Sequence, residues 1–248
     1  MYSLRMAPKN MFKNFDGIAG IKYGISEKSD GAMEPARNGL VGADNRRKFF
    51  VSQKIDLLNT VSVEQPHSAD VVKVFGKDRN KIIPEADGLV TSEKNLFLTI
   101  TVADCFPIYF YNQVSKSVGI VHSGWRGTVG NIAGQAVKAM GGKSSDIIAG
   151  IGPGIQACHF EIKEDVLGKF ADYPEAIIHR GKKIFIDLPK IISRQLIEAG
   201  LNIDNIESVG QCTFCEKEKF FSYRRDKPNQ VEAMIAYIGL GPSNHVII

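Results

Sequence analysis

The chain has 248 residues, 44% of them hydrophobic and 23% charged, which is an ordinary soluble composition and enough to bury a core without disulfide or metal cross-links. The net charge is only +4 and no long basic run occurs, which argues against a dedicated nucleic-acid-binding protein but leaves a small anionic substrate compatible. The most apolar stretch, residues 95–111, is interrupted by Asp104 and Pro107, and the N-terminus lacks the apolar core of a signal peptide. With four cysteines, too few for a disulfide scaffold, we expect a cytoplasmic protein that enters no membrane.

In chain order, the sequence first predicts a loosely held arm over residues 1–16 and a long polar surface loop over residues 26–48. Short apolar runs then predict strands at 61–63, 71–75, 96–101, 107–111, 118–121, 147–151, 206–209, 220–223 and 233–238. Apolar residues at helical spacing predict helices over 128–140, 161–170 and 187–200, the last capped by Asp187. Many strands with few helices indicate an α+β fold with a mixed sheet. No shift in composition divides residues 1–248, so we expect a single domain.

Three side chains that bind metals well are expected at strand ends. His67 follows one predicted strand, His122 ends another, and Cys105 lies in a break between two apolar strands. Strand ends can converge at one edge of a sheet, and two imidazoles with one thiolate are a good ligand set for Zn²⁺ that leaves a fourth position open. The spacings match no short zinc-finger pattern, so a buried structural cysteine with two hydrogen-bonded histidines stays an alternative.

Arginines near these positions indicate an anion site. Gly124-Trp125-Arg126-Gly127 is a tight turn before a predicted helix, where free N–H groups and a guanidinium suit phosphate. Arg224 and Arg225, at the end of the aromatic run 220–223, are further candidates for holding a phosphate or carboxylate. The alternatives are solvated arginines and a pairing of one of them with Asp226.

The pair Cys212 and Cys215 forms a C-x-x-C motif without a partner pair, which is half a zinc site at best. It also lacks the strand-to-helix setting of a thioredoxin-like motif, so the favoured interpretation is two buried structural thiols.

Several motifs taken together resemble one known family. In order they are Gln65-Pro66-His67, Ala86 to Thr91, Thr101 to Pro107, Val121 to Thr128, Ile151-Gly152-Pro153 and Phe220 to Asp226. The combination of A-D-C-x-P, H-x-G-W-R-G-T and F-F-S-Y-R-R-D is similar to the YfiH-like family, also called the laccase-domain or multicopper polyphenol oxidase family. The resemblance covers about residues 18 to 240.

The resemblance implies a four-layer α/β/β/α arrangement of mixed sheets and a purine nucleoside phosphorylase. Such an enzyme cleaves adenosine, inosine, guanosine or 5′-methylthioadenosine with inorganic phosphate, and it also deaminates adenosine. It implies a catalytic zinc bound by His67, Cys105 and His122. Asp104, beside Cys105, is a candidate for supporting the ligand or moving a proton, with a loop-capping carboxylate as the alternative. The expected partners are purine nucleosides and phosphate, bound by a monomer or homodimer.

One loop departs from the family pattern. Family members usually have S-T-R-x-G-G where this chain has residues 26–31, so Lys28 stands where an arginine is expected. Lysine is a point charge rather than a fork, so Lys28 is a candidate phosphate ligand whose change bears on substrate preference.

The family's name also raises a copper-dependent polyphenol oxidase. A trinuclear copper cluster is held by paired histidines in H-x-H motifs, and none of the five histidines here lies two residues from another. A single His₂Cys copper site is chemically allowed. Copper oxidation is therefore the alternative function, with a non-enzymatic metal-binding partner of a larger assembly as a third.

Overall fold

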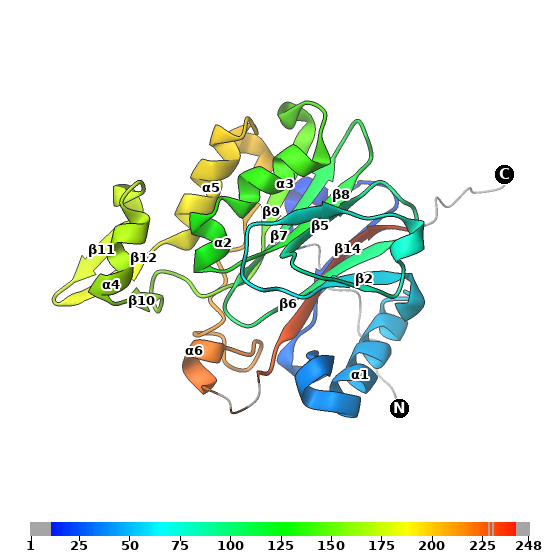
Figure 1. Cartoon of the computed structure of the whole chain (residues 1–248), viewed down its shortest axis with the longest axis horizontal. Coiled ribbons are helices and arrows are strands. Elements are labelled where there is room, and N and C mark those ends of the chain that lie inside the picture. The colour runs from blue at the N-terminus through cyan, green and yellow to red at the C-terminus, as the bar shows by residue number, and fades with distance from the viewer. Residues whose placement is uncertain (1–10, 228, 230, 242–248) are drawn as a thin grey trace.

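In the computed structural model, which describes residues 11–227, 229 and 231–241, the chain forms a mixed α/β fold with three sheets (Figure 1). The first sheet has the order β1-β14-β6-β2-β4, formed by Ile21–Ile25, Met234–Leu240, Phe97–Val102, Thr60–Val63 and Ile82–Ile83. The second has the order β13-β9-β7-β8-β5-β3, formed by Ile206–Ser208, Ile147–Ile151, Phe106–Asn112, Val118–Ser123, Gly88–Thr91 and Val71–Lys73. Both contain parallel and antiparallel neighbours, which confirms the mixed sheets expected from the sequence.

A third, antiparallel sheet has the order β10-β12-β11, formed by Glu161–Ile162, Lys183–Ile186 and Ile177–Arg180. The helices are α1 to α6, formed by Pro35–Ser52, Trp125–Val129, Ile132–Met140, Glu164–Leu167, Leu188–Glu198 and Tyr223–Asp226. Among the described residues, no helix combines the length and the apolar character needed to cross a membrane.

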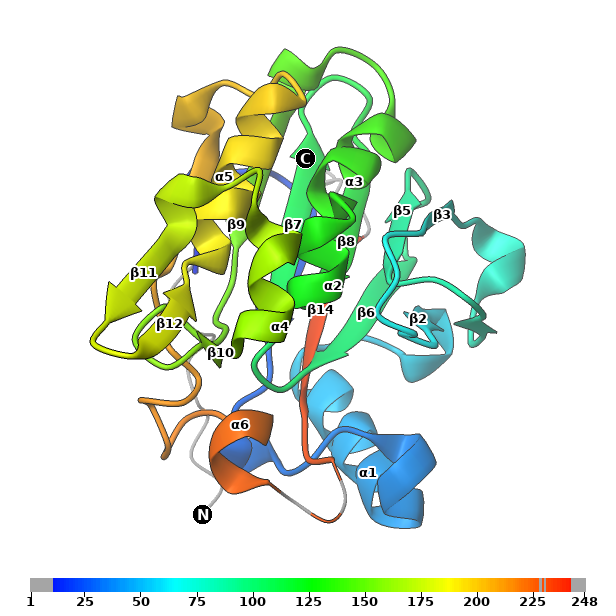
Figure 2. The same ribbon diagram turned by 60° about the vertical axis from the view of Figure 1, so that its left-hand side comes forward.

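Three apolar clusters hold the large sheets and the helices together. One lies between the six-stranded sheet and helices α3 and α5, a second between the two large sheets, and a third between the five-stranded sheet and α1. Figure 2 shows α3 and α5 over one face of the six-stranded sheet, with α1 at the other end of the molecule. Strand β7 is buried along its whole length because it faces helices on one side and the second sheet on the other.

The N-terminal segment differs from the expected loose arm. Residues 1–10 lie outside the described residues, but Phe12 and Phe15 are buried at 0% and 2% exposure. The Phe12 ring lies 5.4 Å from that of Tyr109 on β7 and 5.7 Å from that of Tyr23 on β1. Apolar burial of these two aromatic rings therefore fastens residues 11–16 to the core.

The loop predicted over residues 26–48 is wrong, because most of it belongs to helix α1. This helix begins with a proline in its first turn, and its buried Phe49 and Phe50 lie near its C-terminal end. The residues before Phe49 show little apolar periodicity, so the sequence pattern does not indicate a helix.

The strand predicted at 220–223 is also wrong. Phe220 and Phe221 are buried without a strand partner, and Ser222 instead caps α6 by accepting a hydrogen bond from the Arg225 N–H. The helix predicted over 128–140 is two helices, separated at Asn131, whose φ is 58°. The segment 161–170 begins as strand β10 before turning into α4 and a 3₁₀ turn.

Candidate metal centre and its pocket

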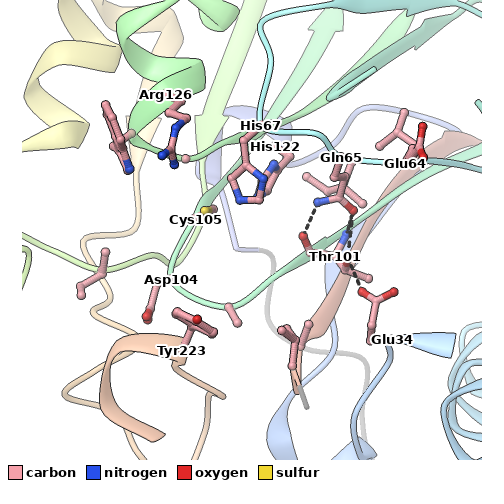
Figure 3. Close-up of a pocket in the computed structure, with 18 of the residues that line it drawn as sticks. Glu34, Glu64, Gln65, His67, Thr101, Asp104, Cys105, His122, Arg126 and Tyr223 are labelled. Atoms are coloured by element: carbon pink, nitrogen blue, oxygen red, sulfur yellow. Dashed lines mark hydrogen bonds between the residues drawn. The ribbon is translucent and has the colours of Figure 1, made fainter. Parts of the chain in front are cut away.

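His67, Cys105 and His122 meet in one cluster, with their potential ligand atoms all within 4.8 Å of one another (Figure 3). The antiparallel pairing of β7 with β8 explains part of this. Phe106, the first residue of β7, pairs with Ser123, so Cys105 and His122 come to the same sheet edge. The imidazole rings of His67 and His122 are nearly perpendicular, with centroids 4.8 Å apart.

His67 reaches the cluster through a strained turn after β2. Gln65 and His67 have φ values of 63° and 67°, in the left-handed region that non-glycine residues rarely adopt. The Gln65 side chain holds this turn, because its Nε2 donates to the Thr101 carbonyl at 2.7 Å and its Oε1 accepts from the Thr101 N–H at 2.8 Å. Strain of this kind persists only where neighbouring contacts fix it, and it is common at functional sites.

Asp87 orients the ring of His122 and holds the backbone at His67. Its buried carboxylate lies 2.8 Å from Nδ1 of His122 and accepts hydrogen bonds from the backbone N–H groups of His67 and Ser68, at 3.2 and 2.6 Å. Because Nδ1 of His122 bonds to Asp87, its Nε2 is the nitrogen left for a metal. A carboxylate behind a ligating histidine is the usual support of a protein metal site.

Electrostatics favour an ionised thiol in this cluster. Burial opposes ionisation, but His122 and His67 outweigh it and lower the pKa of Cys105 to about 6. Burial likewise opposes charge on Asp87, yet the hydrogen bond with His122 and those from Ser68 hold the pKa of Asp87 below its usual value. The donor set of one thiolate and two imidazoles therefore suits Zn²⁺, with a tetrahedral position left over.

Gly124, between β8 and α2, lets the backbone pass close to Cys105 and His67. A Cβ there would lie 2.8 Å from Sγ of Cys105 and 3.3 Å from Cδ2 of His67. A side chain at this position would therefore displace two candidate ligands.

The cluster opens into a cavity of about 660 Å³, within the range of small-molecule sites. Arg126 and Arg224 line one part of its wall, and Glu34, Gln65 and Thr101 line another. Figure 3 shows Arg126 and Glu34 on opposite sides of the histidines.

The sequence-predicted cations divide into two groups. The Arg126 guanidinium lies over the Trp125 ring at 4.4 Å, and Arg224 donates from Nη1 to the Glu161 carbonyl at 2.8 Å; both line the cavity. Arg225 and Lys28 do not line it.

The two cations outside the cavity are engaged elsewhere. Arg225 donates to the carbonyls of Thr213, Phe214 and Phe220 and pairs with Asp226 at 2.7 Å, so the predicted phosphate role of Arg225 does not fit this structure. The Lys28 ammonium lies 5.6 Å from the centre of the Phe221 ring, and its role as a phosphate ligand stays a prediction.

Asp104 lines the cavity, but its carboxylate is engaged. Oδ1 accepts from the Thr213 hydroxyl at 2.6 Å and Oδ2 accepts from the Arg224 N–H at 2.7 Å. This geometry fits the loop-capping alternative, with Asp104 fastening the loops around the candidate ligand Cys105.

Sequence reasoning missed two residues of the site. Asp87 lies in the motif Ala86 to Thr91, which contributes to the family resemblance, but the sequence indicated no role for it. Arg46, on α1, lines the cavity and donates to the Met33 carbonyl; burial outweighs the attraction of Glu34 and lowers the pKa of Arg46 to about 10. The sequence pattern carries no signal for Arg46, because it predicts a loop where the helix lies.

With this geometry in view, comparison with known proteins identifies the family. Residues 38–241 match the family described as multi-copper polyphenol oxidoreductase laccase. The chain belongs to this family. That result confirms the resemblance seen in the sequence motifs.

Relatives in this family cover nearly the whole chain. The purine nucleoside phosphorylase YlmD of Geobacillus stearothermophilus is 33% identical over 246 residues, covering 90% of this chain and 89% of that protein. The protein of the same name from Bacillus subtilis is 34% identical over 253 residues, covering 92% and 90%. The crystal structure of YlmD from Geobacillus stearothermophilus has a TM-score of 0.84 at 31% identity, covering 93% of this chain and 94% of that one. YfiH of Bacillus licheniformis has a TM-score of 0.82 at 31% identity, covering 94% and 100%.

Proposed function

We propose that the chain is a zinc-dependent purine nucleoside phosphorylase that splits adenosine, inosine, guanosine or 5′-methylthioadenosine with inorganic phosphate. The observation that carries the proposal is a His₂Cys cluster opening into a cavity that Arg126 and Arg224 also line. The names of the relatives support the same reaction class.

The ligand set supports zinc over a multicopper centre. His67, Cys105 and His122 supply one anionic and two neutral ligands, and a bound Zn²⁺ would act as a Lewis acid on a reactant in the open position. In the part of the chain that the structure describes, no potential metal site gathers more than two histidines. A trinuclear copper cluster therefore has no set of ligands there.

The remaining groups divide the cavity by charge. Arg126 and Arg224 suit phosphate, which attacks the sugar carbon while the bond to the purine breaks and positive charge grows on the ribose. The purine then lies towards Gln65, Thr101 and Glu34, on the far side of the candidate ligands in Figure 3. Both carboxylate oxygens of Asp104 already accept hydrogen bonds. Asp104 therefore positions the site and does not supply the proton that the departing purine takes up.

The deciding assay supplies adenosine with and without phosphate and follows the products by chromatography. We expect adenine and ribose 1-phosphate only when phosphate is present, with slow formation of inosine as the deaminase side activity. Free ribose regardless of phosphate would identify a hydrolase. Oxidation of phenols without nucleoside turnover would instead establish the copper oxidase.

The metal is tested by Cys105→Ala. Removing the only anionic ligand of this cluster is expected to abolish both zinc binding at the cluster and turnover. An unchanged rate of phosphorolysis in this variant would exclude a catalytic zinc here.

A further inference from the structure

A second cluster of metal-binding side chains lies outside the cavity. Cys158, His159, Cys212 and Cys215 place one potential ligand atom each within 4.8 Å of all the others. Sγ of Cys158 lies 3.5 Å from Sγ of Cys212 and 3.7 Å from Sγ of Cys215. Nδ1 of His159 lies 3.2 Å from Sγ of Cys158 and 3.3 Å from Sγ of Cys215.

These separations match the edges of a zinc tetrahedron. Bonds of about 2.3 Å to sulfur and about 2.0–2.1 Å to nitrogen place two sulfurs about 3.8 Å apart, and a sulfur and a nitrogen about 3.5 Å apart. The four edges given above run from 3.2 to 3.7 Å. Four protein ligands complete the tetrahedron and leave no position for substrate, which is the pattern of a structural zinc site.

We propose that Cys158, His159, Cys212 and Cys215 bind a second, structural Zn²⁺. All four cysteines of the chain are free thiols, and three of them gather here. The ring of Phe214 stacks on His159 at 4.0 Å with an angle of 15°, which orients the imidazole.

Backbone and exposure also suit this site. The N–H of Gln156 lies 3.5 Å from Sγ of Cys212, within the distance of a hydrogen bond to sulfur, a contact that stabilises a thiolate. Cys212 is buried, while Cys158 and Cys215 are exposed, so an ion can enter from solvent. This exposure also corrects the sequence-based interpretation of Cys215 as a buried structural thiol.

The site joins two loops that are far apart in sequence. Cys158 and His159 lie between β9 and β10, whereas Cys212 and Cys215 lie between β13 and α6. Backbone hydrogen bonds link the loops at Gly154, whose N–H donates to the Gln211 carbonyl and whose carbonyl accepts from the Thr213 N–H, both at 3.2 Å.

The joined loops support the wall of the catalytic cavity. Thr213, between the two cysteines of the C-x-x-C motif, donates its hydroxyl to Asp104, the neighbour of Cys105. Arg225 donates to the carbonyls of Thr213 and Phe214 and so ties the same loop to α6, which also carries Arg224. Zinc would hold the loop that positions Asp104 without contacting a substrate.

Metal content tests the proposal directly. The full chain is purified under reducing conditions without chelator, and its metals are measured by mass spectrometry against protein concentration. We expect two zinc ions per wild-type chain and one in Cys215→Ser, with Cys158→Ser as a second exposed variant should the first fail to fold. Cys105→Ala is the matched control, because it removes a thiolate from the other cluster.

Spectroscopy then identifies the ligands. X-ray absorption at the zinc edge of Cys105→Ala is expected to show three sulfurs and one nitrogen around the remaining ion. We also expect a chelator to lower the melting temperature of Cys105→Ala but not that of a Cys105→Ala/Cys215→Ser double variant.

Several results would overturn the proposal. One is a wild-type chain with a single zinc that Cys105→Ala removes, and another is equal zinc content in wild type and Cys215→Ser. Iron in place of zinc in Cys105→Ala would refute the identity of the metal. Alkylation of only two thiols after chelation and denaturation would reveal a disulfide in place of the site.

Discussion

At the scale of single residues, Asp87 governs the geometry of the candidate catalytic cluster. Its carboxylate bonds to the His122 ring and accepts hydrogen bonds from the backbone N–H groups of His67 and Ser68. It is fully buried, so losing its charge leaves these donors without an equivalent acceptor. The two histidines therefore depend on one carboxylate that neither of them adjoins in sequence.

We expect Asp87→Asn to weaken zinc binding at His67, Cys105 and His122 by about 10–100-fold, the usual cost of removing such a support. The measurement is competition for zinc with a chelator of known affinity, with kcat/KM for phosphorolysis as a second readout. Asp70→Asn is the control, because Asp70 is an exposed acid near His67. Equal affinities in the Asp87→Asn variant and the wild type would show that the hydrogen bond is not needed.

A second set of variants distinguishes arginines that bind phosphate from an arginine that stabilises the fold. A charge-assisted hydrogen bond contributes about 1.5–3 kcal/mol, so Arg126→Ala or Arg224→Ala is expected to raise the KM for phosphate at least about tenfold. Arg225→Ala should instead lower the melting temperature, because it leaves three backbone carbonyls without their donor. Arg47→Ala, at an exposed position on α1, is the control for loss of charge. A phosphate KM raised only by Arg225→Ala would reverse these assignments.

The candidate ligands could be predicted from the sequence because metal-binding side chains are chemically distinctive and follow apolar strands. The residues that hold these ligands in place could not be predicted. Asp87 acts through a hydrogen bond to His122, 35 positions away, and nothing in the local pattern separates it from an ordinary turn aspartate. Arg225 looks like a free cation in sequence, but its donors are consumed by carbonyls that only the folded loop brings together.

At the scale of secondary-structure elements, the break between α2 and α3 shows how one residue divides a helical pattern. Asn131 adopts a left-handed conformation with φ of 58°, and its side chain accepts from the Gly134 N–H at 3.0 Å. The break lets α2 begin directly after Gly124, beside the metal cluster, while α3 packs on the six-stranded sheet.

We expect Asn131→Ala to lower the free energy of unfolding by about 1–3 kcal/mol, since it removes the cap and places an alanine in a left-handed conformation. Asn131→Gly loses the same cap without the conformational penalty, so its cost should be clearly smaller. Urea unfolding of the two variants and the wild type provides the comparison. Equal stability of the alanine and glycine variants would contradict the account of this turn.

Elements whose own sequence carries their periodicity were predictable. Strand β9 matches its predicted span, and α5 begins after its predicted cap, with the Asp187 carboxylate accepting from the Lys190 N–H. Helix α1 and the segment 220–223 were not predictable, because their form depends on distant partners. Phe49 packs against Tyr237 of β14, and Phe221 lies over the inner face of the five-stranded sheet.

At the scale of the whole molecule, the buried Tyr109 and Tyr237 and the half-buried Tyr23 form hydrogen bonds between different parts of the fold. The hydroxyl of Tyr109, on β7, donates to the Gly24 carbonyl on β1 at 3.0 Å and so links the two large sheets. The hydroxyl of Tyr237, on β14, donates to Oε1 of Gln53 at the end of α1. Tyr23 contacts the N-terminal segment by donating to the Phe12 carbonyl.

These three phenols should make the fold sensitive to alkali. Burial raises the pKa of Tyr23, of Tyr109 and of Tyr237 above the ordinary value of a tyrosine, because a phenolate is poorly solvated inside the protein. In the unfolded chain the same groups ionise near pH 10. Above that pH the unfolded state binds fewer protons than the folded state, so the free energy of unfolding falls as pH rises.

We therefore expect the contribution of these tyrosines to stability to be fully present below about pH 10 and to decline above it, by up to about 1.4 kcal/mol per pH unit for each phenol. Tyr109→Phe should make the free energy of unfolding fall less steeply with pH above about pH 10, by the contribution of one phenol. The variant also removes the hydrogen bond to Gly24 and so lowers stability at pH 8. Urea unfolding from pH 8 to pH 11 measures both effects. Tyr223→Phe, whose side chain is 57% exposed, is the matched control and should leave the slope unchanged. A slope that Tyr109→Phe does not alter would mean that the phenol between the two sheets reaches water before the fold opens.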